Sequence, residues 1–291
     1  MTFSEGGGSF EGGRVGTRRG GGRGLAVGGG LGALAVALIA VFTGVDLSGV
    51  LGGGASSGQE TAGTIGECTV EEANTDRSCR LSATIQSLDD YWAVALPESG
   101  TDLVRPDVWA FEAATSTGCG NATSSTGPFY CPPDQSIYLD LGFFDVLQSQ
   151  FGASGGPLAE MYVVAHEYGH HIQTLTGVMD GADRSGTGAT SDSVRVELQA
   201  DCYAGVWAGN AATQVDPERG APYLEPITEI QLADALSAAE AVGDDHIQEQ
   251  SGGDVDPHVW THGSSDQRQQ WFMTGYSQGS MAACDTFAAD L

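Results

Sequence analysis

Residues 166–170 read HEYGH, the pattern in this chain most able to carry chemistry. If the segment is helical, His166 and His170 lie one turn apart on the same face. Two neutral imidazoles so placed can bind one Zn²⁺ ion, and Glu167 beside them can take a proton from water. The pattern therefore predicts a zinc hydrolase. His171 follows directly and points about 100° away on a helix, so we exclude it from the same ligand set.

A third ligand is needed, because a catalytic zinc site uses three protein ligands and keeps one position open. Residues 197–201 read ELQAD, so Glu197 and Asp201 would share one face of a second helix. We predict that Glu197 is the third ligand. Asp201 can accept the outer N–H of a ligating histidine, which fixes the tautomer of the ring.

The elements that must position these residues can be predicted from apolar spacing and turn signals. The first metal-binding helix is expected over 158–175, after Gly155-Gly156-Pro157 and before a C-terminal Gly177. The second is expected over 194–208, after the capping cluster at 191–193. Elsewhere we expect a helix over 81–96, strands over 108–113 and 136–141, a loop over 119–131, and a capping box at Ser264 and Gln267.

The N-terminal part differs in composition from the rest. Residues 1–24 are mostly Gly, Ser and Arg, which predicts a disordered cytoplasmic tail. Residues 25–45 contain no charge over 21 positions, close to the ~20 needed for a membrane-spanning helix. Residues 46–66 read as a Gly/Ser-rich linker, and 67–291 as the folded domain.

The arginines before residue 25 and Asp46 after the apolar run predict an N-terminus in the cytoplasm and a domain outside it. A cleaved signal peptide is the alternative. We favour an uncleaved signal anchor because the run is long and no clear A-x-A site follows it.

Six cysteines lie beyond the apolar run, an even number that favours an oxidising compartment. Short spacing suggests the pairs Cys68–Cys79 and Cys119–Cys131, which leaves Cys202 for Cys284. None forms C-x-x-C, which argues against a cysteine zinc site.

The formal net charge of −27 includes no lysine. Such an acidic protein repels nucleic acid, so we expect no nucleic-acid partner. The acidity could favour basic substrates, but solubility in salt is the simpler interpretation.

The combined motifs resemble a known family. HEYGHHIQ, ELQADCYAGVW, THGSSDQR and the C-terminal CDTF are similar to the bacterial neutral zinc metallopeptidase family, with a glutamate-zincin arrangement of HExxH and ExxxD. The resemblance covers 67–287 and implies an α+β, zincin-like domain, mainly helical with a small sheet. It also implies Zn²⁺ held by His166, His170 and Glu197, with Glu167 as the catalytic base. By analogy with zincins, strand 136–141 is expected to be the sheet edge along which an extended substrate lies.

An oxyanion that develops during peptide hydrolysis usually needs a further donor. We favour His262 over His246, His258, Tyr168 and Tyr276, because it lies in a small polar loop with Gly263 that could reach a cleft. A surface or capping-loop histidine is the competing interpretation.

Three functions remain open. The favoured one is a membrane-anchored zinc metallopeptidase that cleaves a peptide or protein substrate outside the cytoplasm. The others are a non-catalytic metal-binding interaction protein and a zinc amidase acting on cell-wall peptide. An intact Glu167 argues against the non-catalytic protein. Two histidines and one carboxylate also suit Fe(II), but the HExxH helix favours zinc.

Overall fold

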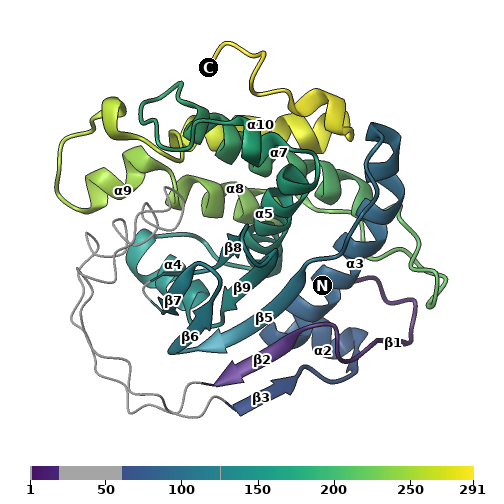
Figure 1. Cartoon of the computed structure of the whole chain (residues 1–291). Coiled ribbons are helices and arrows are strands. Elements are labelled where there is room, and N and C mark those ends of the chain that lie inside the picture. Colours follow the sequence, from purple (N-terminus) through teal and green to yellow (C-terminus); the bar gives the residue numbers. More distant parts are fainter. Residues whose placement is uncertain (1, 20–60, 125) are drawn as a thin grey trace.

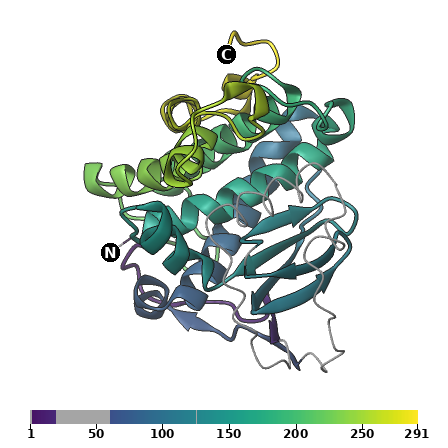
Figure 2. The same cartoon turned by 90° about the vertical axis from the view of Figure 1, so that its left-hand side faces the viewer.

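The computed structural model describes residues 2–19, 61–124 and 126–291, and these form an α+β fold (Figures 1 and 2). The strands are β1 (Ser9–Phe10), β2 (Gly16–Arg19), β3 (Thr61–Thr64), β4 (Cys68–Thr69), β5 (Asp107–Glu112), β6 (Ala114–Thr117), β7 (Gly120–Thr123), β8 (Phe129–Cys131) and β9 (Ser136–Asp140). The helices are α2 (Val70–Thr75), α3 (Arg77–Ala95), α4 (Phe143–Phe151), α5 (Pro157–Leu175), α6 (Val178–Gly181), α7 (Asp192–Ala211), α8 (Glu229–Ala241), α9 (Asp244–Gln250) and α10 (Ser265–Gln278). Short 3₁₀ helices occur at η1 (Leu96–Ser99), η2 (Pro257–Val259) and η3 (Met281–Cys284).

The main sheet has the strand order β3-β2-β5-β9-β8. Strands β2, β5 and β9 are parallel, whereas β3 and β8 are antiparallel to their neighbours. Among the described strands β8 therefore forms one edge, and β9 lies inside the sheet. The expectation that 136–141 is the edge strand is wrong, because 129–131 pairs along its outer side.

Helix α5 lies at the centre of the helical part. It contacts β8 and β9 on one side and α3, α7 and α8 on others, and α10 packs on α7 (Figure 1). Pro157 occupies its first turn, and Gly177, at a φ of +79°, follows its C-cap residue Thr176. Every residue of 158–173 is buried. The helix is thus part of the core rather than a surface helix with one apolar stripe.

The other predicted elements fall close to their expected positions. The helix expected over 81–96 begins earlier, at the N-cap Asp76, and the second metal-binding helix begins after Ser191. The capping box at Ser264 and Gln267 is present. The segment 119–131, expected as a loop, instead contributes to the β6–β7 hairpin and to β8.

All three predicted disulfides are present: Cys68–Cys79, Cys119–Cys131 and Cys202–Cys284. The last joins α7 to the C-terminal η3, across 82 positions of sequence.

The prediction of a disordered tail is wrong for residues 2–19. Strand β2 lies between β3 and β5, and Phe3, Phe10 and Val15 are at most 1% exposed. Arg14 adds an ion pair to the buried Asp89 on α3. A few well-spaced apolar residues are enough to dock a Gly-rich segment, so the folded domain extends beyond the predicted boundary at residue 67.

This sheet bears on the predicted membrane topology. Within the described residues, no helix combines the length and apolar character required to cross a bilayer. The expected span, 25–45, lies outside the described residues. Arg18 of β2 is paired with Ala62 of β3 and with Phe111 of β5, which places 16–19 on the same side of any membrane as the domain. The predicted topology, with the two on opposite sides, does not fit this pairing.

Candidate metal centre

The imidazoles of His166 and His170 meet on one face of α5. Their Nε2 atoms lie 3.1 Å apart, and both side chains are buried. The helical spacing predicted from HEYGH thus brings both rings to one point.

Glu197 on α7 completes the group. Its Oε2 lies 3.2 Å from His166 Nε2, and its Oε1 lies 3.4 Å from His170 Nε2. The two helices come close at Gly169, where an added Cβ would lie 3.1 Å from the backbone of Ala200. Glycine at this position lets α7 approach closely enough to deliver Glu197.

The residues fit a zinc ion. One ligand atom from each of His166, His170 and Glu197 lies within 4.8 Å of the other two. Both carboxylate oxygens of Glu197 are buried, and the two imidazole Nε2 atoms lie near them without forming a hydrogen bond of good geometry, an arrangement that is costly unless a cation neutralises the carboxylate. Two imidazoles and one carboxylate are the donor set of many catalytic zinc sites.

Each histidine is oriented by a further side chain. His166 Nδ1 lies 2.7 Å from Asp201 Oδ1, the placement expected from the ELQAD motif. His170 Nδ1 lies 2.8 Å from Gln173 Oε1, and the Gln173 amide donates to the carbonyl of Val196. Both rings therefore direct Nε2 toward Glu197.

Glu167 lies beside the metal group, within electrostatic range of both imidazoles and Glu197. It is 5% exposed, and its Oε2 has no hydrogen-bond partner. Burial, more than the neighbouring charge of Glu197, raises the pKa of the Glu167 carboxyl, although the imidazoles oppose this. A carboxylate with a raised pKa is suited to accept and return a proton.

His262 is also buried near this group, held by Asp244 at the start of α9. Asp244 Oδ2 accepts the backbone N–H groups of Thr261, His262 and Gly263, and its Oδ1 lies 3.2 Å from His262 Nδ1. Burial alone would lower the pKa of His262, but Asp244 and, to a smaller extent, Glu197 together more than offset burial and raise this pKa. His262 is thus held in place by Asp244, with its pKa raised by this carboxylate and by Glu197.

Three of the four other oxyanion candidates have different contacts. The Tyr168 hydroxyl donates to Asp89, and His246 Nε2 contacts the carbonyl of Phe151. His258 is exposed on η2.

Sequence reasoning missed Arg268 and Tyr162. The Arg268 guanidinium forms two hydrogen bonds to Asp201, of 2.9 and 3.0 Å, and the Tyr162 hydroxyl donates to Asp201 over 2.6 Å. Burial alone would raise the pKa of the Asp201 carboxyl, but Arg268 and His166 together more than offset burial and hold this pKa below its usual range. The signal for Tyr162 was its position one turn before His166 on the same helix face.

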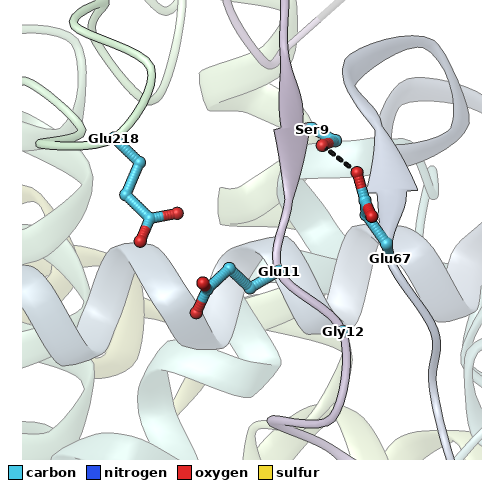
Figure 3. A pocket seen from close by; sticks show the side chains of 5 residues that line it. All are labelled: Ser9, Glu11, Gly12, Glu67 and Glu218. Carbon is cyan, nitrogen blue, oxygen red and sulfur yellow. Dashed lines mark hydrogen bonds between the residues drawn. The ribbon is translucent and has the colours of Figure 1, made fainter.

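A second group of carboxylates lies outside α5 and α7. Glu11, Glu67 and Glu218 line a pocket with Ser9 and Gly12, and Ser9 donates to Glu67 (Figure 3). The charge of Glu11 raises the pKa of Glu218. All three carboxylates are exposed to water, and no imidazole lines the pocket. We therefore assign the chemistry to α5 and α7.

Comparison with known proteins shows the family to which the chain is similar. A family model described as "Putative neutral zinc metallopeptidase" matches residues 5–287, which include the N-terminal strands. An uncharacterized protein of Mycobacterium tuberculosis is 53% identical over 77% of this chain and 75% of its own length. The uncharacterized protein YpfJ of Escherichia coli is 38% identical over 90% of this chain and 88% of its own length. No solved structure matches the chain.

Proposed function

The chain belongs to the neutral zinc metallopeptidase family, and from this premise we propose that it is a zinc-dependent peptidase with a zincin-like fold, in which Glu167 acts as catalytic base. The observation that carries the proposal is the convergence of His166, His170 and Glu197, with the buried Glu167 beside them. A protein that only bound metal would have no need of a buried carboxylate beside the ion with one oxygen left without a hydrogen bond.

The residues of this chain have distinct roles in the proposed reaction. When bound, Zn²⁺ supplies Lewis acidity, which lowers the pKa of water and polarises a carbonyl oxygen. Glu167 removes a proton from the attacking water and then donates it to the leaving amine. The carboxylate is thereby restored at the end of the reaction. His262, whose pKa Asp244 raises, donates a hydrogen bond in this proposal to the oxygen on which negative charge develops.

Strand β8, a short strand of three buried residues, is our candidate for the element that aligns an extended substrate. It is the sheet edge that contacts α5, and the backbone of Tyr130 hydrogen-bonds to Glu167. A peptide added to an edge strand gains main-chain hydrogen bonds, which bring its carbonyl groups into a fixed register. We propose that the substrate lies along β8 and passes Glu167.

The proposed location is an extracytoplasmic, membrane-associated one. Three disulfides support an oxidising compartment. The apolar run over 25–45 supports contact with a membrane. In this proposal residues 2–19 lie with the domain, because β2 pairs with β5.

The test compares wild type with Glu167→Gln for zinc content and for cleavage of an unfolded protein. We expect both to hold zinc, and only wild type to cleave. Glu229→Gln is the matched control, because Glu229 is exposed on α8. Wild type that holds zinc but cleaves neither peptides nor cell-wall fragments would overturn the peptidase proposal in favour of an interaction protein. Cleavage confined to cell-wall fragments would identify an amidase.

A further inference from the structure

Arg268 lies in the first turn of α10, beyond the metal ligands, and its side chain is 3% exposed. Burying a guanidinium is costly unless it is paired and hydrogen-bonded. Its partner is Asp201, with Nε donating to Oδ2 and Nη2 donating to Oδ1. The remaining Nη1 donates to the carbonyl of Val242. This is a two-point contact that only the planar guanidinium fork can make.

Asp201 is held through both carboxylate oxygens. Its Oδ1 accepts from Tyr162 and Arg268 and lies 2.7 Å from His166 Nδ1, while its Oδ2 accepts from Arg268. The orientation of the carboxylate is therefore fixed from the side of α10. Since His166 is oriented by that same carboxylate, the fork of Arg268 sets the direction of His166 Nε2.

We propose that Arg268 is a positioning residue for the metal, which holds Asp201 in the orientation that aims His166 at the ion and so raises zinc affinity. The proposal rests on the proposed function only in taking zinc as the bound metal.

The charge of Arg268 and its positioning role have opposite effects on zinc affinity. Arg268 Nη2 lies 3.9 Å from Glu197 Oε2, so its positive charge is near the ligand group and repels a cation. If charge alone mattered, removing Arg268 would tighten zinc binding. If positioning dominates, removing Arg268 weakens zinc binding, because outer partners of ligating histidines typically contribute about 10–100-fold to metal affinity. The sign of the change separates the two.

The close packing of α10 on α7 supports a rigid attachment. Gly275 of α10 faces the backbone of α7, and an added Cβ there would overlap the carbonyl of Cys202. Cys202 is joined to Cys284, just beyond α10. The helix that carries Arg268 is therefore fixed directly beside Asp201.

The experiment measures zinc affinity of the full chain by competition with a chromophoric chelator, without any activity assay. We expect Arg268→Gln to weaken zinc binding by about 10–100-fold, and Arg268→Lys, which keeps the charge but not the fork, to recover only part of the loss. Arg80→Gln is the matched control. Arg80 is another buried arginine, paired with Glu160 over 2.7 Å at the far end of α5. We expect it to lower thermal stability and leave zinc affinity unchanged.

A double variant tests the route of the effect. If Arg268 acts through Asp201, Arg268→Gln should weaken zinc binding little further in an Asp201→Asn background. Unchanged or tighter zinc binding in Arg268→Gln would overturn the proposal, as would full recovery in Arg268→Lys or an equal loss in Arg80→Gln. If Arg268→Gln does not fold, the zinc affinity of Arg268→Lys is compared in the wild-type and Asp201→Asn backgrounds instead. A wild-type protein that binds zinc but cleaves no peptide would overturn the peptidase proposal. It would not affect the proposed positioning role of Arg268.

Discussion

The hydroxyl of Tyr130 donates a hydrogen bond to Nδ1 of His171 over 3.2 Å, and this contact joins the zinc-binding helix to the edge strand β8. His171 Nε2 lies 2.6 Å from the carbonyl of Val104, to which it must donate, so Nδ1 is the acceptor. Burial lowers the pKa of His171, which keeps the ring neutral. The third histidine of HEYGHH is thus a structural link, consistent with its exclusion from the ligand set.

We therefore expect His171→Ala to reduce the free energy of unfolding by about 2–4 kcal/mol, because it leaves a cavity and removes two hydrogen bonds. Tyr130→Phe, which removes only the hydroxyl, should cost about 1 kcal/mol. Neither should change zinc affinity. Urea unfolding measures the free energy of unfolding, and competition with a chelator measures zinc affinity. A large loss of zinc affinity in His171→Ala would contradict the assignment.

Gly169→Ala tests the close approach of α5 and α7. The added Cβ would lie 3.1 Å from the Cα and carbonyl oxygen of Ala200, atoms of a buried helix that cannot easily move. We expect a net destabilisation of about 1–3 kcal/mol and weaker zinc binding, since Glu197 moves with α7. Gly181→Ala is the control, because nothing lies within 4 Å of its added Cβ. Equal stability and equal zinc affinity of the two variants would show that α5 and α7 can accommodate a methyl group at position 169.

The disulfides should differ in their contribution to stability. Cys202–Cys284 closes 82 positions, against 11 for Cys68–Cys79. Chain entropy then predicts a loss of about 4.5 kcal/mol on replacing the first pair with alanine, and about 2.8 kcal/mol on replacing the second. Unfolding of each double variant in urea measures this difference. A larger loss from the short pair would indicate that native-state contacts, rather than chain entropy, dominate.

The Asp244–His262 pair gives a pH dependence of defined sign. The folded pKa of Asp244 is lowered, so its contribution to stability is lost as the pH falls from about 4. The folded pKa of His262 is raised, so its contribution is complete below about 6.5 and is lost as the pH rises through the folded value.

Asp244→Asn should therefore destabilise the protein most between about pH 4 and 6.5. A smaller cost should persist at pH 9, where Asp244 of the wild type still accepts three backbone N–H groups. Urea unfolding at pH 3, 5.5 and 9 on wild type and variant measures the difference. A cost that does not vary with pH would show that the ion pair contributes nothing beyond the backbone contacts.

The site was more predictable from sequence than the sheet. Helical periodicity places His166 and His170 together without reference to the rest of the fold, and the ELQAD spacing does the same for Glu197 and Asp201. Arg268 could not be found in this way, because its contact with Asp201 depends on how α10 packs on α7. The sequence around Arg268, which follows a capping box, does not indicate which residue its side chain contacts.

The N-terminal strand shows a different limit. Composition suggested disorder for 1–24, yet β2 is an interior strand, held by long-range pairing with β5. Propensity describes a segment alone, whereas β-pairing depends on a partner nearly a hundred residues away. The edge strand was misassigned for the same reason, since periodicity identifies strands but not their order.

His262→Ala tests the proposed oxyanion donor. Removing one such donor typically lowers kcat by about 10²–10³-fold, with a small effect on KM, because the hydrogen bond strengthens only as charge develops. His258→Ala is the matched control, since His258 is an exposed histidine four residues earlier. Zinc content should stay at the wild-type level in both variants, because neither residue is among the ligand group of α5 and α7. If kcat of His262→Ala equals that of His258→Ala, the Asp244–His262 pair serves only to hold the 261–263 loop, and the donor must come from elsewhere.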